Sequence, residues 1–312
     1  MSITNKGSVF LKEMKKSRIF LMCFLVIFLF LMCGCNEESS LQKNKKCSVV
    51  CTVFPLYDWT RTIVQGFEED VSLQYLFDDG SDVHSFQPGA DDYVTIAESD
   101  IFIYCSGAGT DWIEDILMNN PDNERIVIDL TMAEGIILLD NIVTEHDHGE
   151  GNDNHVHDEN CNHEEGRYDE HIWMSLENAM ASVSSVADAL GEKLPQHLST
   201  IDGNKEAYLT LLEELQNEYV RTVETTENPY MLVADRFPFL YMTKPYGISF
   251  DSAFAGCQTE SEADFDMIVR LASLADEHGV SAIAITEVAD EKLAQTVIDN
   301  MTNKGTLYQP WR

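Results

Sequence analysis

The sequence predicts an α/β protein with two lobes of mostly parallel sheet, joined by helix. Short apolar runs alternate with helix-period segments before residue 144, and a second alternating set follows residue 224. Two long helical stretches lie between these sets. Strands that alternate with helices are typical of α/β units, in which successive strands lie parallel in one sheet. At 312 residues, 44% of them hydrophobic, the chain is long enough for two lobes of medium size.

The first lobe is predicted over residues 47–174. Its short apolar runs are interpreted as buried strands, and the segments with apolar residues at helical spacing as helices. In chain order these elements are the strand Val49–Phe54, the helix Leu56–Gln65, the strand Val71–Phe77, the helix Ala90–Ala97, the strand Ile101–Cys105, the helix Asp111–Met118 and the strand Ile126–Leu130.

Residues 144–166 interrupt this pattern with a histidine-rich stretch that has almost no apolar side chains. Such a segment cannot pack a core, so we expect a mobile loop. It holds five of the nine histidines: His146, His148, His155, His157 and His163. Imidazoles bind transition metals and the neighbouring acids raise the local cation concentration, which favours loose capture of zinc. A neutral solvated insertion is the alternative.

The second lobe is predicted over residues 224–312, after connecting helices within residues 175–223. The connecting helices are Leu176–Leu194 and Lys205–Val223, the second with apolar residues at helical spacing. The second α/β set then runs through Tyr230–Val233, Ile248–Phe254, Asp264–Asp276, Ser281–Ile285 and Lys292–Met301.

The first 35 residues are predicted to be an export signal. Four basic residues between Lys12 and Arg18 precede the uncharged apolar run Ile19–Met32, which is short for a membrane span. The run ends in Cys33-Gly34-Cys35, which resembles a bacterial lipobox with Cys35 as the lipidated residue. We therefore expect an extracytoplasmic protein that is lipid-anchored to a bacterial membrane through the polar tether 36–46. Cleavage by an ordinary signal peptidase and a plain transmembrane anchor are the alternatives.

The charge of the chain argues against nucleic acid as a partner. The 54 acidic residues outnumber the 20 basic ones, for a formal net charge of −34. Nucleic acid phosphates need a basic patch, and anionic lipid equally disfavours a strongly acidic body. An acidic surface suits a protein that handles cations.

Five cysteines follow the predicted anchor: Cys47, Cys51, Cys105, Cys161 and Cys257. An odd number without CxxC spacing indicates neither a disulfide framework nor a zinc finger. Most are interpreted as small buried hydrophobes. Cys161 is the exception, because it lies among the histidines of the 144–166 loop.

Histidines and acids occur at or after the ends of predicted strands, where open α/β sheets bind their ligands. His84 follows the strand that ends at Phe77, His171 follows the histidine-rich loop, and Glu287 and Asp290 follow the strand that starts near Ser281. Imidazole and carboxylate together suit Zn²⁺ or another divalent transition metal. For each residue alone, a solvated loop side chain is the alternative. Motifs of hydrolases and nucleotide-binding proteins, such as GxSxG, Walker A or HExxH, are absent from the sequence.

Four ordered motifs resemble the substrate-binding proteins of zinc and manganese ABC transporters. Val53–Asp58 is similar to their FYPLYD segment, and His84–Pro88 to HxYEP. Asp100–Tyr104, with Gly107–Gly109 and Trp112, looks like DLFIYNGAGLEPW. Tyr168–Trp173, after a histidine-rich loop, resembles YDPHVW. The resemblance extends from about Val49 to Asn300.

This resemblance implies a metal cleft between the two lobes, with His84 and His171 as the first two ligands. Where the family has its third ligand the sequence has Ala234, which cannot coordinate a metal, and the neighbouring Asp235 is one replacement. Asp290 aligns with the aspartate ligand of the manganese branch, and Glu287 lies near the acid used in some zinc members. The resemblance also implies that the chain stops at Arg312 before a further strand and helix, so that the second lobe lacks an edge strand or a packing helix.

The predicted function is therefore the substrate-binding component of an ABC importer, which delivers zinc, or alternatively manganese, to a membrane permease without catalysis. A secreted metalloenzyme is one alternative, in which an acid such as Glu287 activates metal-bound water. A metal buffer that acts through the histidine-rich loop alone is another.

Overall fold

The computed structural model describes residues 46–77, 86–107, 109–122, 124–141, 168–254, 263–286, 291–303 and 306–308. All of these residues belong to one compact unit, Lys46–Arg312. Within the described ranges, no helix is both long enough and apolar enough to cross a membrane. The predicted signal, Cys35 and nearly all of the tether lie outside the described residues, and the predicted domain boundaries stay predictions.

The first sheet has four parallel strands in the order β2-β1-β3-β4. The strands are β1 (Cys47–Cys51), β2 (Val71–Tyr75), β3 (Ile101–Tyr104) and β4 (Ile126–Asp129). In the central pair, Val49 lies opposite Ile101 and Cys51 opposite Ile103. Because all the strands are parallel, their carboxyl ends meet at one edge of the sheet.

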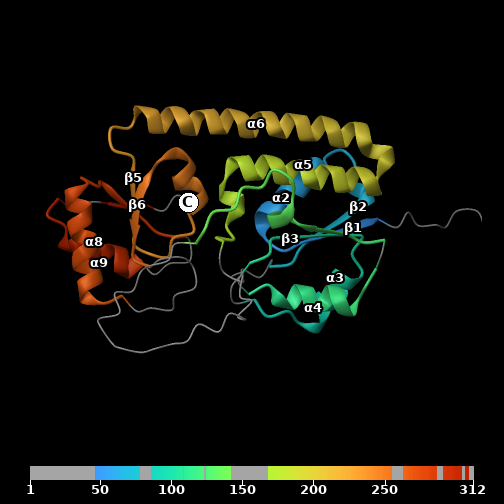
Figure 1. Ribbon diagram of the computed structural model, residues 1–312, viewed down its shortest axis with the longest axis horizontal. Helices are drawn as coiled ribbons and strands as arrows, with labels where there is room; N and C mark the ends of the chain where they lie inside the picture. Colours follow the sequence, from blue (N-terminus) through green and yellow to red (C-terminus); the bar gives the residue numbers. More distant parts are fainter. Residues whose placement is uncertain are drawn as a thin grey trace, which may run out of the picture. The chain divides into compact units, whose positions relative to one another are not determined.

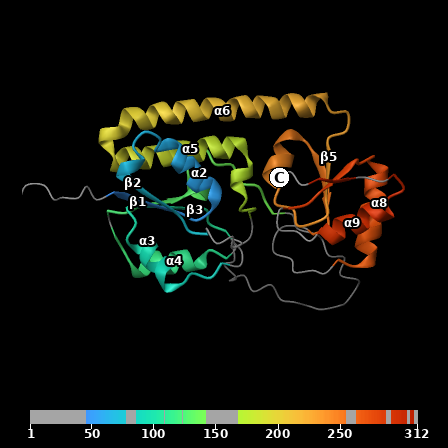
Figure 2. The ribbon, with the colours of Figure 1, turned by 180° about the vertical axis from the view of Figure 1, so that it is seen from behind.

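Helices cover both faces of this sheet, as Figures 1 and 2 show. Successive side chains of a strand point to opposite faces, and the residues of β1 and β3 divide accordingly. Val49, Cys51, Ile101 and Ile103 pack with α2 (Phe54–Ile63) and α5 (Leu176–Lys193). Val50 and Phe102 pack with α3 (Ala90–Ala97) and α4 (Asp111–Asn119).

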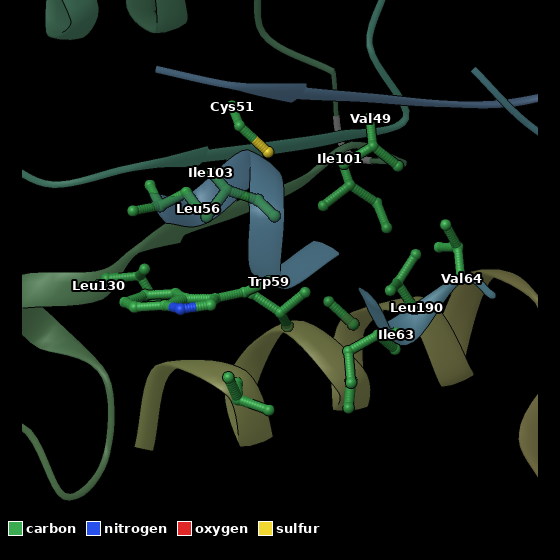
Figure 3. Close-up of a cluster of buried hydrophobic side chains, with 14 of the residues drawn as sticks. Val49, Cys51, Leu56, Trp59, Ile63, Val64, Ile101, Ile103, Leu130 and Leu190 are labelled. Carbon is green, nitrogen blue, oxygen red and sulfur yellow. The ribbon is translucent and has the colours of Figure 1, made fainter. Parts of the chain in front are cut away.

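The core between the first sheet and its helices is apolar (Figure 3). Leu56, Trp59 and Ile63 lie on one face of α2 and are at most 6% exposed. They pack with Leu190 of α5 in the same cluster. Trp59 is therefore a packing residue.

The helix α6 (Leu198–Thr225) joins the two lobes and begins seven residues before the predicted Lys205. Its first turns are held by tertiary contacts, since Ile201 is fully buried and the amide of Asn204 donates to the carbonyls of Ile63 (2.8 Å) and Gln65 (2.9 Å). Near its other end, the ring of Tyr219 lies 5.5 Å from the ring of Tyr246 in the second lobe.

The second sheet also has four parallel strands, in the order β6-β5-β7-β8. They are β5 (Tyr230–Val233), β6 (Ser249–Ser252), β7 (Ala282–Ala284) and β8 (Thr306–Tyr308). Leu232 and Ile283 pack in the cluster formed with α8 (Phe265–Glu277) and α9 (Glu291–Asn300). Val233 instead packs with Phe237, Phe239 and Leu240, beside the short helix α7 (Leu240–Thr243). These two sheets confirm the predicted two-lobe α/β fold.

Several other predicted element boundaries were wrong, and two elements were missed. Phe54 opens α2 instead of ending β1, because Pro55 suits the first turn of a helix, where its missing N–H is not needed. β2 ends at Tyr75, and β6 covers only Ser249–Ser252. The sequence did not predict α7 or β8, and β8 supplies an edge strand of the second sheet. Single 3₁₀ turns complete the described elements: Glu68–Asp70 (η1), Leu130–Met132 (η2), Ile172–Met174 (η3), Pro195–His197 (η4) and Lys244–Tyr246 (η5).

The described cysteines are buried, as predicted. Cys47, Cys51 and Cys105 pack in the core of the first lobe. Burial raises the pKa of Cys51 to about 12 and also raises the pKa of Cys105 well above its usual value. These thiols therefore stay protonated and inert. Cys161 and Cys257 lie outside the described residues.

Candidate metal site

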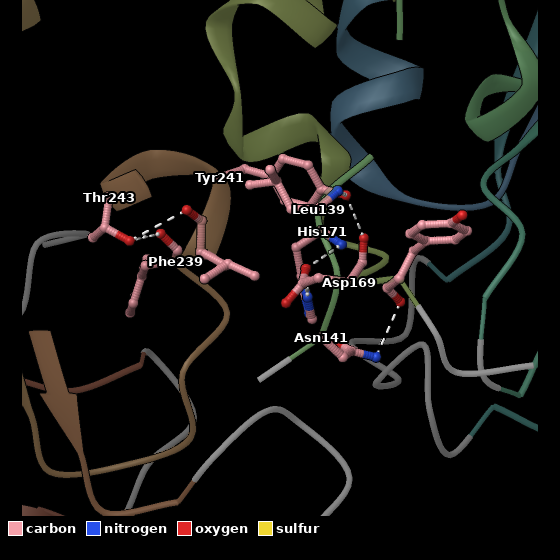
Figure 4. Close-up of polar contacts among 9 residues, drawn as sticks. Leu139, Asn141, Asp169, His171, Phe239, Tyr241 and Thr243 are labelled. Carbon is pink, nitrogen blue, oxygen red and sulfur yellow. Dashed lines mark hydrogen bonds and ion pairs between the residues drawn. The ribbon is translucent and has the colours of Figure 1, made fainter. Parts of the chain in front are cut away.

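His171 is the predicted metal ligand that the structure describes, and its imidazole is held by a neighbouring carboxylate. It immediately precedes η3 and is 8% exposed. Its Nδ1 lies 2.9 Å from Oδ1 of Asp169, and its backbone N–H donates to the same oxygen at 2.9 Å. Figure 4 shows this pair. The ring also stands edge-on to Trp173, with 5.3 Å between the centroids.

This contact decides which nitrogen of His171 can bind a metal. A carboxylate oxygen only accepts hydrogen bonds, so Nδ1 carries the proton and the ring lone pair is on Nε2. Histidines that bind metals in proteins usually donate their other ring N–H to a carboxylate or carbonyl, which fixes the ring and raises its basicity. His171 and Asp169 therefore have the arrangement that a zinc ligand requires.

The segment that carries Asp169 and His171 is itself firmly held. Asp169 is 3% exposed, and its backbone N–H donates to the carbonyl of Leu139 at 2.9 Å. Asp140 and Tyr168 form an antiparallel bridge beside this bond. The hydroxyl of Tyr241, from α7, donates to the carbonyl of Asp169 at 2.8 Å and accepts from the N–H of Leu139 at 3.0 Å. Burial raises the pKa of Tyr241 to about 12, so the phenol keeps the proton that it donates.

Two of the sequence motifs quoted above are in contact here: the loop after β3, which contains Gly107, and the segment Tyr168–Trp173. A side chain at Gly107 would place its Cβ 2.7 Å from Cβ of Glu170. That distance is shorter than real side-chain contacts allow, so residue 107 has to be glycine for Glu170 to pack there. Glu170 itself is 8% exposed. The loop after β3 thus lies directly against the Tyr168–Trp173 segment, at the carboxyl edge of the first sheet.

At the corresponding edge of the second sheet, Ala234 faces the core. It is 2% exposed, packs with Ala253 and Ile285, and donates its N–H to the carbonyl of Ala284 at 2.9 Å. The position where the resemblance expects a ligand is therefore occupied by a small core side chain.

Asp235, the predicted replacement for this ligand, already has a hydrogen-bonding partner. Its Oδ2 accepts from the backbone N–H of Thr286 at 3.3 Å and from the Thr286 hydroxyl. These bonds tie the segment after β5 to the segment after β7. Glu287 directly follows Thr286 in the sequence.

The remaining predicted site residues lie outside the described residues. They are His84, Glu287 and Asp290, together with His146, His148, His155, His157 and His163 of the histidine-rich loop. Over the ranges that the structure covers, no group of three or more His, Cys, Asp or Glu side chains gathers as a metal centre. The predicted ligand set and the cleft thus stay predictions, with His171 as their described member.

Two residues that support the site were not assigned a role from the sequence. Asp169 had a local signal, since an acid two residues before a histidine can reach back to its Nδ1. Tyr241 had no signal, because its hydrogen bonds join positions that are 72 and 102 residues apart in the chain.

Comparisons with known proteins agree with this architecture. The family model described as zinc-uptake complex component A, periplasmic (ZnuA), matches residues 49–310. The zinc-binding protein AdcA of Streptococcus pyogenes serotype M3 is 26% identical over 298 residues, which cover 95% of this chain and 56% of that protein. The high-affinity zinc uptake system protein ZnuA of Bacillus subtilis is 26% identical over 284 residues, which cover 90% of this chain and 83% of that protein.

A solved structure has the same fold. The crystal structure of the metal-dependent lipoprotein YcdH from Bacillus subtilis matches with a TM-score of 0.65 at 22% identity, over 84% of this chain and 87% of that one. At this identity the likeness concerns the fold alone. The chain spans only slightly more than half the length of the streptococcal relative.

Proposed function

The chain belongs to the family of periplasmic zinc-uptake complex components (ZnuA), and from this premise we propose that it binds extracytoplasmic zinc and delivers it to an ABC importer. The zinc ion is the cargo, held by protein side chains and released unchanged. Manganese is the alternative cargo. A carrier needs ligands for the ion but no reactive group beside it, so no enzymatic step is proposed.

The observation that carries this proposal is the buried His171–Asp169 pair, with 2.9 Å between Nδ1 and Oδ1. Neutral imidazole is a preferred zinc ligand, and a carboxylate behind it fixes the tautomer that presents Nε2. The zinc relatives AdcA and ZnuA, each 26% identical to this chain, support zinc as the cargo.

The ligand set we propose is His84 and His171 from the first lobe, with Glu287 or Asp290 from the second. Two imidazoles with one or two carboxylates suit a tetrahedral zinc ion. Ala234 contributes no ligand, and Asp235 holds Thr286 instead. The site then has fewer nitrogen ligands than one built from three histidines, and depends more on its carboxylates.

The histidine-rich loop and the N-terminus complete the proposal. The five loop histidines collect zinc loosely and raise its concentration near the high-affinity site. Lipidation at Cys35 holds the protein on the outer face of the bacterial membrane, within reach of the permease that receives the ion. The zinc-binding lipoprotein AdcA of Streptococcus pneumoniae, 22% identical over 297 residues, supports this anchor.

Metal analysis and calorimetry test the proposal. Protein purified without added metal is analysed for bound ions, then stripped and titrated with zinc. We expect one tight site that is lost in the double variant His84→Ala/His171→Ala and kept when residues 144–166 are deleted. His278→Ala is the matched control, because that imidazole stacks on Tyr230 and takes no part in the proposed site.

Other outcomes would decide against the proposal in distinct ways. A double variant that still binds one zinc ion tightly would exclude the two histidines as ligands. Loss of all binding on loop deletion would make the protein a metal buffer. Zinc-dependent cleavage of model esters, peptides or phosphates would make it an enzyme.

A further inference from the structure

Tyr241 connects the second lobe to the histidine that we propose as a zinc ligand. It belongs to α7, whose neighbours Leu240, Phe239 and Phe237 pack with Val233 of the second sheet. Its own ring is 1% exposed and lies in the core cluster of the first lobe. A side chain of one lobe is therefore buried in the core of the other.

The hydroxyl of Tyr241 closes a small ring of hydrogen bonds around the main chain of the first lobe. It accepts from Leu139 N–H and donates to Asp169 C=O, while Asp169 N–H donates to Leu139 C=O. Figure 4 shows Tyr241 beside Leu139, Asp169 and His171. Both main-chain groups are on buried or half-buried residues, where a lost partner leaves a polar group unsatisfied.

From this ring the contacts continue to the imidazole. Oδ1 of Asp169 accepts from both Nδ1 and the backbone N–H of His171, each at 2.9 Å. The direction of that carboxylate depends on where the Asp169 main chain is held. Two consecutive contacts therefore connect α7 to the proposed ligand: Tyr241 to Asp169, and Asp169 to His171.

We propose that Tyr241 is a positioning residue: its hydroxyl fixes the Asp169 main chain so that Asp169 orients His171 for zinc, and it thereby couples α7 to the metal site. The part about zinc rests on the proposed function, whereas the positioning of His171 does not. A purely structural role for Tyr241 predicts a change in stability with no change at the imidazole.

The test compares Tyr241→Phe with Thr243→Val in the full chain. Tyr241→Phe removes the hydroxyl and keeps the ring. Thr243→Val is the matched control, because it removes a fully buried hydroxyl from the same helix that donates only to the carbonyls of Phe239 and Leu240. Imidazole ¹⁵N signals are recorded for the metal-free proteins, with His171 assigned from the variant His171→Gln.

We expect His171 to be in the Nδ1–H tautomer in the wild type and in Thr243→Val, and to shift partly to the Nε2–H tautomer in Tyr241→Phe. The zinc affinity of Tyr241→Phe should fall by up to about tenfold, because direct partners of metal-bound histidines contribute about 10- to 100-fold and Tyr241 acts one contact further away. Identical ¹⁵N signals in the wild type and Tyr241→Phe would overturn the proposal.

A second measurement covers the case in which Tyr241→Phe does not fold. Hydrogen exchange of the Leu139 amide, which donates to Tyr241, is followed in the wild type with and without zinc. We expect slower exchange with zinc, and an unchanged rate would contradict the coupling. If the wild type bound no zinc, the proposed function would fail while the ¹⁵N comparison still decided whether Tyr241 positions His171.

Discussion

The two lobes have the same architecture but different side chains at the carboxyl ends of their strands. Each has four parallel strands with helix packed on both faces. At the edge of the first sheet, a buried carboxylate orients the imidazole of His171. At the edge of the second, Ala234 faces the core and Asp235 holds Thr286. The same architecture thus carries an oriented imidazole in one lobe and structural side chains at the equivalent place in the other.

From this difference we expect the lobes to contribute unequally to the proposed zinc site. An imidazole that is already oriented loses little conformational freedom when it binds an ion, so more of its interaction energy remains as affinity. The acids at Glu287 and Asp290 follow a segment that is anchored through Asp235 and Thr286. We expect the first lobe to supply most of the affinity, and the second to complete the coordination.

The largest expected effect is that of removing the oriented ligand itself. His171→Ala should weaken zinc binding by more than about 100-fold, which is the upper end of what a lost partner behind a ligand costs. Glu287→Ala or Asp290→Ala alone should cost less, because the other acid remains. Competition with a chromogenic chelator at fixed pH measures each dissociation constant. Equal losses in all three variants would show that the lobes contribute equally.

The next effect isolates the carboxylate behind the ligand. Asp169→Ala removes both hydrogen bonds to His171 and should weaken zinc binding about 10- to 100-fold. Asp169→Asn should cost less, because its side-chain oxygen still accepts from Nδ1–H but lacks the charge that raises the basicity of the imidazole. If both variants bound zinc like the wild type, His171 would not depend on Asp169 for its orientation.

The sequence was sufficient for the fold class because strands and amphipathic helices have local signals. The alternation of Val49, Val50 and Cys51 between two faces follows directly from the strand period. The signals fail where tertiary contacts decide the structure. The start of α6 at Leu198 depends on Ile201 and on bonds from Asn204 to residues about 140 positions away. With four residues, α7 is too short to show any period.

From the sequence, the candidate site consisted of proposed ligands only, and of these the structure describes His171 while the others stay predictions. His171 stands in a motif that resembles a known family, and Asp169 lies close enough in sequence to suggest a contact. Tyr241 could not be found, because nothing near it in sequence indicates that its hydroxyl reaches Leu139 and Asp169. The burial of Ala234 was also not predicted, since the resemblance showed only that alanine stands where the family has a metal ligand.

A histidine at position 234 tests whether a side chain there can reach a metal, as the family resemblance implies, or stays in the core because of packing. Ala234→His should destabilise the protein by about 1–3 kcal/mol, because it forces a larger side chain into a filled core. It should not raise the affinity for zinc, because the side chain at this position faces Ala253 and Ile285. Calorimetric unfolding and chelator competition measure the two quantities. A gain in zinc affinity would mean that residue 234 can face the metal.

The smallest effect concerns the tie between Asp235 and Thr286. Thr286→Val removes the hydroxyl that donates to Asp235 and leaves the backbone bond, so we expect a loss of about 0.5–1.5 kcal/mol in the free energy of unfolding. Zinc affinity should stay unchanged, in contrast to the Asp169 variants, because Asp235 holds Thr286 and not an imidazole. Thr296→Val is the control, since that exposed hydroxyl donates only to Lys292 within α9. If Thr286→Val weakened zinc binding as much as Asp169→Ala does, Asp235 would itself be a ligand or its support, and the two lobes would share the site evenly.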